Sequence, residues 1–396
     1  MKLRWTYMIL VFLVGMGSIA GAQETDRALQ AYQDRFRDAS PAIKLQILQT
    51  ADALPVEDLG PLYVQGLQFV LSNSARFESD TVLQKVALVA TEKVGEGLYA
   101  PAGNSLWSLF DAIEDNITRI AILGVLGDIG EGNAELVLDL NGWVQAQVNL
   151  YRGGVVLDLM VLQAAVQTLG DLGDVTSFPV LLDAQLAHTS NRVSDTARES
   201  MKGLPGDYVQ LAIQTINRRT ISDQLAALNF FLDDSDLTDE ERAVLATGVM
   251  SQAVRTATRG ITEQQALREV RFRAAQELGD IPYEGAADSL IRHFNLTFQS
   301  YARGLIANVP VLVAITALGS TGSEAAAVRL TQFLNLLTSY TENSRPYDTQ
   351  ITLSTVTNLG RLGDLVAYDA LFYVTLLNYP QRVKDAARSA LDAVSR

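Results

Sequence analysis

The strongest constraint on this chain is a short stretch that recurs along it. The hexapeptide LGDLGD occupies 169–174, related versions begin at Leu123 (LGVLGD), Leu318 (LGSTGS) and Leu359 (LGRLGD), and a shortened LGD begins at Leu278. Recurrence at intervals of tens of residues indicates structural units that stack on one another. We therefore expect a repeat protein, although a chain of 396 residues would ordinarily suggest about two or three compact domains.

Each copy of the motif ends a helical pattern. Apolar or small side chains precede it at intervals of four residues, which places them on one face of a helix. The same pattern occurs twice without the glycine. The five stripes are Val161, Ala165 and Leu169; Val193, Ala197 and Met201; Val270, Ala274 and Leu278; Ile351, Thr355 and Leu359; and Val383, Ala387 and Leu391. We predict that these faces are buried and that the small central residue lets another helix approach closely.

The motif itself predicts a corner between two helices. Glycine readily adopts the left-handed conformation that closes a helix, and in LGDLGD this role is assigned to Gly170, with Leu172 folding back on the last turn. Asp174 or a nearby residue is expected to cap the next helix. Twelve residues beyond four of the anchors stand Leu181, Leu290, Leu330 and Leu371. Each unit is therefore expected to be two helices joined by this corner.

The longest interval between anchors has room for two units. It runs 77 residues from Met201 to Leu278 and contains four helical patterns, at 207–218, 221–232, 238–254 and 262–278. Helix pairs that repeat every 30 to 50 residues or so cannot bury their apolar faces singly and must stack. The predicted fold class is therefore all-α, an α-solenoid.

Two segments resemble HEAT repeats. VRFRAAQELGD at Val270–Asp280 is similar to the second helix of a HEAT repeat, particularly the variety shared with phycobilisome lyases, and VKDAARSAL at Val383–Leu391 is a second good copy. The resemblance covers about Ile117 to Val394. It implies a superhelical, HEAT- or armadillo-like array of antiparallel helix pairs at 117–396, preceded by an N-terminal helical region of degenerate repeats or a cap at 23–116. HEAT arrays serve many unrelated roles, so the resemblance implies no activity.

The first 22 residues have the order of features found in export signals. Lys2 and Arg4 precede an apolar run, and AGA at 20–22 has the small residues that a signal peptidase needs. We expect cleavage before Gln23 and a location in the periplasm or cell envelope, or secretion. The alternative is an uncleaved anchor, which the run disfavours because a bilayer requires about 20 apolar residues. No later segment is expected to span a membrane.

The composition narrows the function classes further. The absence of cysteine excludes disulfides, thiolate metal sites and cysteine nucleophiles. It also makes phycobilisome-lyase chemistry doubtful, as does the export signal. Without Lys2 and Arg4 the chain carries 29 basic and 45 acidic residues, a net charge of −16. Such a charge repels phosphate backbones, so nucleic acid is not an expected partner.

No catalytic or metal-binding constellation is recognised. The two histidines, His188 near the end of a helix and His293 on a helical surface, do not support a triad or a metal site. The acidic stretch 232–241 lacks the glycine and distant glutamate of an EF-hand. Thr238 and Glu241 are better interpreted as a capping box. We expect no metal, no cofactor and no enzymatic activity.

Aromatic residues beside glycine-rich connections are the weak candidates for binding. Trp107, Trp143 and Tyr151 lie near such connections, where aromatic side chains can anchor a partner, although core packing is the more common role of both tryptophans. The aspartates of the repeated corners are interpreted as helix caps or as rungs of an ion-pair ladder, with Arg271 or Lys384 as partners. Arg271 is also a candidate binding residue.

Two functional hypotheses follow from the sequence. The first is an exported, non-enzymatic scaffold or adaptor that binds protein or peptide partners on a solenoid surface. It rests on the export signal, the repeats and the missing catalytic groups. The second is an envelope enzyme or carrier that uses an acidic groove for a sugar, a peptide or a cation. Convergent carboxylates and aromatic residues in one closed pocket would favour the second.

Overall fold

The structure is a computed structural model that describes residues 27–53, 56, 58–343, 345–346 and 348–395. The expected signal peptide, 1–22, and the expected new terminus at Gln23 lie outside these residues. Within them the chain forms helices and no strand, which confirms the all-α prediction. None of these helices is both long and apolar enough to cross a membrane.

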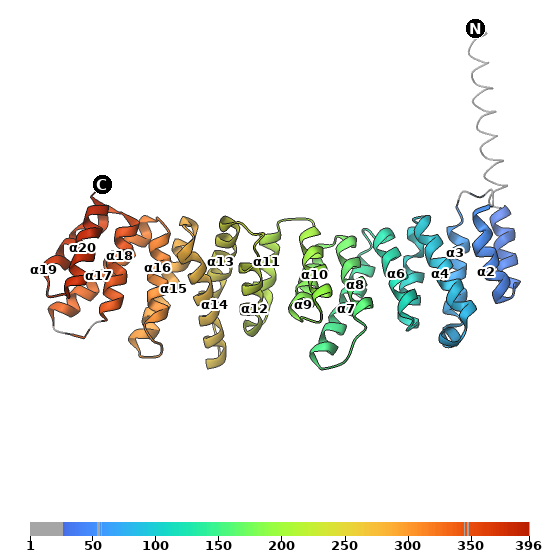
Figure 1. Cartoon of the computed structure of the whole chain (residues 1–396), viewed down its shortest axis with the longest axis horizontal. Coiled ribbons are helices and arrows are strands. Elements are labelled where there is room, and N and C mark those ends of the chain that lie inside the picture. The colour runs from blue at the N-terminus through green and yellow to red at the C-terminus, as the bar shows by residue number, and fades with distance from the viewer. Residues whose placement is uncertain (1–26, 54–55, 57, 344, 347, 396) are drawn as a thin grey trace, which may run out of the picture. The chain divides into compact units, whose positions relative to one another are not determined.

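The chain divides into two compact units, Met1–Gly206 and Asp207–Arg396. The boundary falls within the expected repeat array 117–396. In each unit the helices follow one another in chain order, as Figure 1 shows, and alternate between two layers. Residues 27–38 of the first unit are also helical. This alternation of paired helices is the solenoid-like packing expected from the repeats.

In the first unit, each even-numbered helix packs against the next even-numbered helix. This layer consists of α2 (Pro41–Thr50), α4 (Thr81–Glu96), α6 (Asn116–Ile129), α8 (Leu159–Leu172) and α10 (Asn191–Gly203). The other layer consists of α3 (Gly60–Leu71), α5 (Gly103–Ala112), α7 (Ala134–Arg152) and α9 (Phe178–Leu186). Each of these odd-numbered helices packs against the even-numbered helix that follows it.

The second unit repeats the same arrangement. Its even-numbered layer consists of α12 (Ile221–Leu232), α14 (Ile261–Asp280), α16 (Val309–Ser320), α18 (Thr349–Leu362) and α20 (Gln381–Val394). Its other layer consists of α11 (Tyr208–Arg218), α13 (Asp239–Ala253), α15 (Ala287–Ala302), α17 (Glu324–Glu342) and α19 (Tyr368–Leu376). The four helices expected between Met201 and Leu278 are α11 to α14, with bounds within two residues of the prediction.

The predicted stripes form the core of the even-numbered layer. All members of the stripes ending at Leu169, Met201, Leu278 and Leu359 are buried, as are Val383 and Ala387, whereas Leu391 is half-buried. The leucines twelve residues beyond the anchors, Leu181, Leu290, Leu330 and Leu371, are buried in the odd-numbered layer. The four-residue spacing therefore predicted the buried faces correctly.

The corner was only partly predicted. Gly170 does not close its helix, because α8 continues to Leu172 and it is Gly173 that adopts the left-handed conformation, with φ of +67°. α18 ends in the same way at Gly363, with φ of +65°. Gly170 lies inside the helix and packs against α10, where a side chain would meet its neighbour. In the copies at 169–174 and 359–364 the first glycine thus serves helix packing and the second serves the turn.

The helices joined by this corner are not the closest pair. α7 packs on α8 and α9 on α10, whereas the corner leads from α8 of one pair to α9 of the next. The same holds in the second unit, where the corner after α18 leads to α19, which pairs with α20. The prediction that the corner joins the two helices of one repeat is therefore wrong. The corner instead links one helix pair to the next.

Asp174 and Asp364 act as caps, but each caps the short 3₁₀ turn that precedes the next helix and not that helix itself. Asp174 accepts a hydrogen bond from the backbone N–H of Thr176 at 2.8 Å, at the start of Val175–Ser177. Asp364 accepts one from Val366 at 2.9 Å, at the start of Leu365–Ala367. Asp128, Asp171 and Asp280 instead belong to α6, α8 and α14, because these helices end later than predicted. They therefore do not cap the helices that follow. The capping box of Thr238 and Glu241 is present.

Candidate functional site

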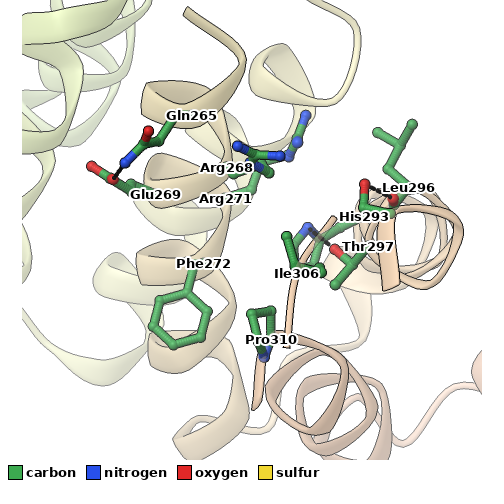
Figure 2. Close-up of a pocket in the computed structure, with 11 residues that line it drawn as sticks. Gln265, Arg268, Glu269, Arg271, Phe272, His293, Leu296, Thr297, Ile306 and Pro310 are labelled. Atoms are coloured by element: carbon green, nitrogen blue, oxygen red, sulfur yellow. Dashed lines mark hydrogen bonds between the residues drawn. The ribbon is translucent and has the colours of Figure 1, made fainter. Parts of the chain in front are cut away.

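A cavity of about 290 Å³ lies in the second unit between α14, α15 and the start of α16. Figure 2 shows arginines from α14 facing His293 and Thr297 from α15. The polar side chains of the lining are Arg268, Arg271, His293, Thr297 and Ser300, and its apolar side chains are Phe272, Leu296, Ile306 and Pro310. Gln265 and Glu269 complete the border of the cavity.

Local sequence explains how the walls are positioned. The Val270, Ala274 and Leu278 stripe of α14 faces the core, which leaves the two arginines on its flank beside α15. α15 ends at a left-handed glycine, Gly304 with φ of +70°, and the turn closes with a hydrogen bond of 3.0 Å from Leu305 N–H to the Ser300 carbonyl. This turn reverses the chain into α16, so that Ile306 and Pro310 border the cavity.

Arg271 makes one hydrogen bond among the described residues, which leaves other N–H donors of its guanidinium unused. Its Nη1 donates to the Ala253 carbonyl at 3.3 Å, while its buried Nε has no hydrogen-bond partner among the described residues. Burial, and then the nearby charge of Arg268, lower the pKa of Arg271 to about 10. The guanidinium therefore stays protonated at neutral pH and is only partly solvated.

Neither arginine of the cavity is neutralised by a carboxylate among the described residues. Within the described residues Arg268 and Arg271 form no ion pair with a carboxylate, and Glu269 accepts a hydrogen bond from Gln265 at 3.1 Å. In Figure 2 Glu269 points away from His293. Arg273, half a turn further along α14, differs because it pairs with Glu277 at 2.9 Å and with Asp233 at 3.0 Å. Arg268 and Arg271 therefore make the cavity a positively charged site in an acidic chain.

His293 was predicted on a helical surface, and that prediction is wrong. The residue is 2% exposed, because it shares the inward face of α15 with Leu290, Phe294 and Thr297. Burial, and then the charge of Arg271, lower the pKa of His293 to about 3, so the ring is neutral at physiological pH. Its Nδ1 lies 3.4 Å from Thr297 Oγ1, and its Nε2 has no partner among the described residues.

Both tryptophan candidates lie in one aromatic cluster of the first unit. Trp107 stacks on Phe110 with ring centroids 5.0 Å apart, and Trp143 packs edge-on against the same ring at 5.2 Å. The Arg119 guanidinium lies 4.4 Å from the centroid of Phe110 and 5.7 Å from that of Trp143. Burial lowers the pKa of Arg119. Both tryptophans are half-buried, so they tie α5, α6 and α7 together and also reach the surface.

The other sequence candidates do not join this cluster. Tyr151 is half-buried two turns further along α7, and its carbonyl accepts a hydrogen bond from Gly154 N–H at 2.8 Å. Arg271 belongs to the second unit. The structure thus brings Trp107 and Trp143 together and places Arg271 in the cavity. Among the described residues, no group of three or more histidine, aspartate or glutamate side chains could hold a metal ion.

Sequence reasoning missed Arg268 and misplaced His293. A usable signal existed for the arginines, since helical arginines are commonly paired with carboxylates three or four residues away. Arg273 has glutamates at both four-residue positions, but Arg268 and Arg271 have none at three or four residues on either side. Two arginines on one helix flank without such partners therefore indicate unused positive charge. The burial of His293 required knowledge of how α15 packs.

The packing described above places the chain in the class of all-α, solenoid-like repeat proteins. No family model matches the chain, and no curated protein matches it. Ten chains of solved structures match it. One of them, from a structure titled "Computational Design of Self-Assembling Cyclic Protein Homooligomers", is 10% identical and has a TM-score of 0.12, and the match covers 90% of this chain and 93% of that one. The fold class therefore rests on the helices themselves.

Proposed function

We propose that this chain is an exported, non-enzymatic HEAT-like scaffold or adaptor that binds a protein or peptide partner, with the cavity between α14 and α15 as one of its contact sites. One observation carries the proposal. In this cavity Arg268 and Arg271, which pair with no carboxylate among the described residues, lie beside the apolar side chains of the lining. Binding pockets combine apolar walls, which give affinity, with a few polar groups, which orient the ligand.

The chemistry of the cavity favours binding over catalysis. A general base works best when its pKa lies near the operating pH, and the pKa of His293, about 3, is far below that range. The Ser300 hydroxyl donates to the Leu296 carbonyl at 2.9 Å, so it is not activated by the histidine. These contacts support a site that holds a ligand without transforming it.

The sign of the charge bears on the rival hypothesis. An envelope enzyme or carrier acting on a sugar, a peptide or a cation was expected to use an acidic groove. The cavity between α14 and α15 instead presents Arg268 and Arg271. A positive cavity in a chain of net charge −14 is suited to an acidic group of a partner, and this favours the binding hypothesis.

Export is part of the proposal and rests on the sequence. The charged start, the apolar run and AGA at 20–22 stand in the order that signal peptidases require. Mass spectrometry of the native protein is expected to find a first residue of Gln23 in the periplasmic or secreted fraction. Detection of an intact Met1 terminus in that fraction would contradict processing.

The binding function can be tested by selection from a peptide library. Random peptides are displayed in two formats, with a free C-terminus or enclosed in a loop, and are selected on the purified chain that begins at Gln23. We expect a consensus in at least one format, and weaker binding of the selected peptides to Arg271→Gln. Arg192→Gln changes an exposed arginine of the first unit and serves as the matched control.

The same preparation decides between binding and catalysis. A broad screen for hydrolase and transferase activity is expected to show no specific turnover. Selection of no peptide above background in either format would contradict the proposal, as would turnover that a single substitution abolishes.

A further inference from the structure

We infer that the cavity between α14 and α15 is a receptor for a singly charged carboxylate that carries an apolar group. This inference deepens the proposed binding function and rests on it. It assigns the cavity a ligand chemistry that can be supplied by the C-terminal residue of a peptide or by a small free carboxylic acid.

The first step of the argument is charge. Arg268 and Arg271 line the same small cavity, repel each other and form no ion pair within the described residues. A ligand anion would relieve this repulsion and supply the acceptor that Arg271 Nε lacks. A planar carboxylate matches the fork of N–H donors on a guanidinium and can accept two parallel hydrogen bonds from it.

The second step is the buried histidine. A buried polar atom without a partner is uncommon in folded proteins, and His293 Nε2 is such an atom on a ring that borders the cavity. When the Thr297 hydroxyl donates to Nδ1, the neutral ring carries its proton on Nε2. That N–H is a neutral donor on the wall opposite the arginines, available to a second carboxylate oxygen.

The third step is the apolar lining. Phe272, Leu296, Ile306 and Pro310 contribute much of the wall, so part of the ligand must be apolar as well. A doubly charged group such as a phosphate monoester would lose more solvation there than a monoanion. The volume of about 290 Å³ lies just below the roughly 300–1,000 Å³ of ligand pockets, so the ligand must be small. A carboxylate with one apolar side chain fits these limits.

Four probes test the inference by calorimetric titration of the chain that begins at Gln23. They are acetyl-Gly-Ala-Ala-Leu with a free carboxylate, the same peptide as its C-terminal amide, N-acetyl-leucine, and N-acetyl-leucine amide. We expect each acid to bind more tightly than its amide by about tenfold or more, since the amide removes a charge-assisted hydrogen bond. Acetyl-Gly-Ala-Ala-Leu binding more tightly than N-acetyl-leucine identifies a peptide end as the source, and equal affinities identify a free acid.

Three variants locate the binding. Arg271→Gln is expected to abolish the preference for the acid, and Arg271→Lys to retain only part of it, because an ammonium keeps the charge without the fork. Arg192→Gln is expected to bind as the wild type does. Thermal unfolding of each variant shows that it is folded before it is titrated.

The inference is overturned if acid and amide probes bind equally, if none binds, or if Arg271→Gln keeps the full preference. Its failure is distinguishable from failure of the proposed function. Peptides selected from the looped library format that bind regardless of their end groups would preserve the adaptor function and remove the carboxylate receptor. Selection of no peptide in either format, together with acid-specific binding of N-acetyl-leucine, would preserve the receptor for a free acid and remove the peptide partner.

Discussion

Gly170 of α8 lies so close to Ser200 of α10 that a Cβ atom at the glycine would stand 2.5 Å from Ser200 Oγ and 3.1 Å from its Cα. The serine hydroxyl donates to the Val166 carbonyl of α8 at 3.2 Å, so the two helices are joined by a hydrogen bond where they approach. Gly360 of α18 repeats the relationship in the second unit, where a Cβ would lie 3.0 Å from Ala390 Cα of α20. In these two copies of the motif the first glycine is therefore a helix-contact residue, whereas Gly124, the first glycine of the copy at 123–128, has open space around it.

Gly170→Ala is expected to lower the free energy of unfolding by about 1–3 kcal/mol, because the methyl group meets backbone as well as side chain and α8 and α10 must separate. Gly124→Ala is the matched control. Gly124 lies inside α6 with open space around it, so alanine there is expected to be neutral or to stabilise by about 0.5–1 kcal/mol. Denaturant unfolding measures both. Equal effects of the two substitutions would show that α8 and α10 are not in close contact.

The sequence predicted correctly that a glycine ends α8, but it assigned this role to Gly170, whereas the helix ends at Gly173. Gly170 and Gly173 have the same neighbours in the repeat LGDLGD, and either fits a helix end. What separates them is Ser200, which lies on the next even-numbered helix. Its approach depends on the stacking of successive pairs, so no local pattern reveals it. The buried stripes were predictable because burial of a helix face leaves a period in the sequence.

Gly173→Ala is expected to destabilise the fold by about 1–2 kcal/mol through backbone strain, since φ of +67° is unfavourable for residues with a Cβ. No atom lies within 4 Å of the added methyl group, so crowding does not contribute. Gly173→Asn should cost less than alanine because asparagine tolerates this conformation. Unfolding midpoints of the three proteins check the order. Alanine and asparagine with the same effect would contradict the left-handed turn.

Ala274→Leu is expected to destabilise the second unit by about 1–3 kcal/mol, because Ala274 is fully buried in the middle of the α14 stripe and extra volume there strains the packing. Gln276 is exposed on the same helix, so Gln276→Ala should change stability by no more than about 0.5 kcal/mol. Hydrogen exchange should rise in α16 as well as in α14, because the two helices pack together. A rise confined to α14 would argue against shared packing between successive helix pairs of the second unit.

The candidate site was less predictable than the fold. Arg271 was named as a partner for the corner aspartates and as a candidate binding residue, whereas its lack of a carboxylate partner among the described residues depends on what α13 and α15 place around it. Trp107 and Trp143 were named singly, and the structure joins them through Phe110. Side chains from different helices meet only after stacking, so sequence periodicity predicts which residues are buried and not which residues are neighbours.

Trp143→Ala is expected to destabilise the first unit by about 1–3 kcal/mol, less than a fully buried tryptophan would, because the ring is half-buried against Phe110. Arg119 would also lose one of its two aromatic contacts. Trp143→Phe keeps an aromatic ring and should cost less. Chemical denaturation of the two variants provides the comparison. If alanine and phenylalanine were tolerated equally, Trp143 would be free of a packing role and available to a partner.

The last prediction concerns the dependence of stability on pH. The pKa of His293 is about 3 in the folded chain and about 6.5 for an unperturbed histidine. Between these values the unfolded chain binds a proton that the folded chain does not. Acidification from pH 6.5 towards 3 therefore favours unfolding, by up to about 1.4 kcal/mol per pH unit, and the stabilising effect of a neutral ring is complete only above pH 6.5.

His293→Gln removes this proton uptake while keeping a polar side chain of similar reach. The free energy of unfolding of the wild type should therefore fall more steeply than that of the variant between pH 6.5 and 4, and their difference should be constant above pH 7. Denaturant titrations at half-unit intervals of pH measure both slopes, with His188→Gln, at an exposed position, as the control for loss of a histidine. Parallel curves for the wild type and His293→Gln would mean that the pKa of His293 is the same in the folded and unfolded chain, and that burial does not hold the ring neutral.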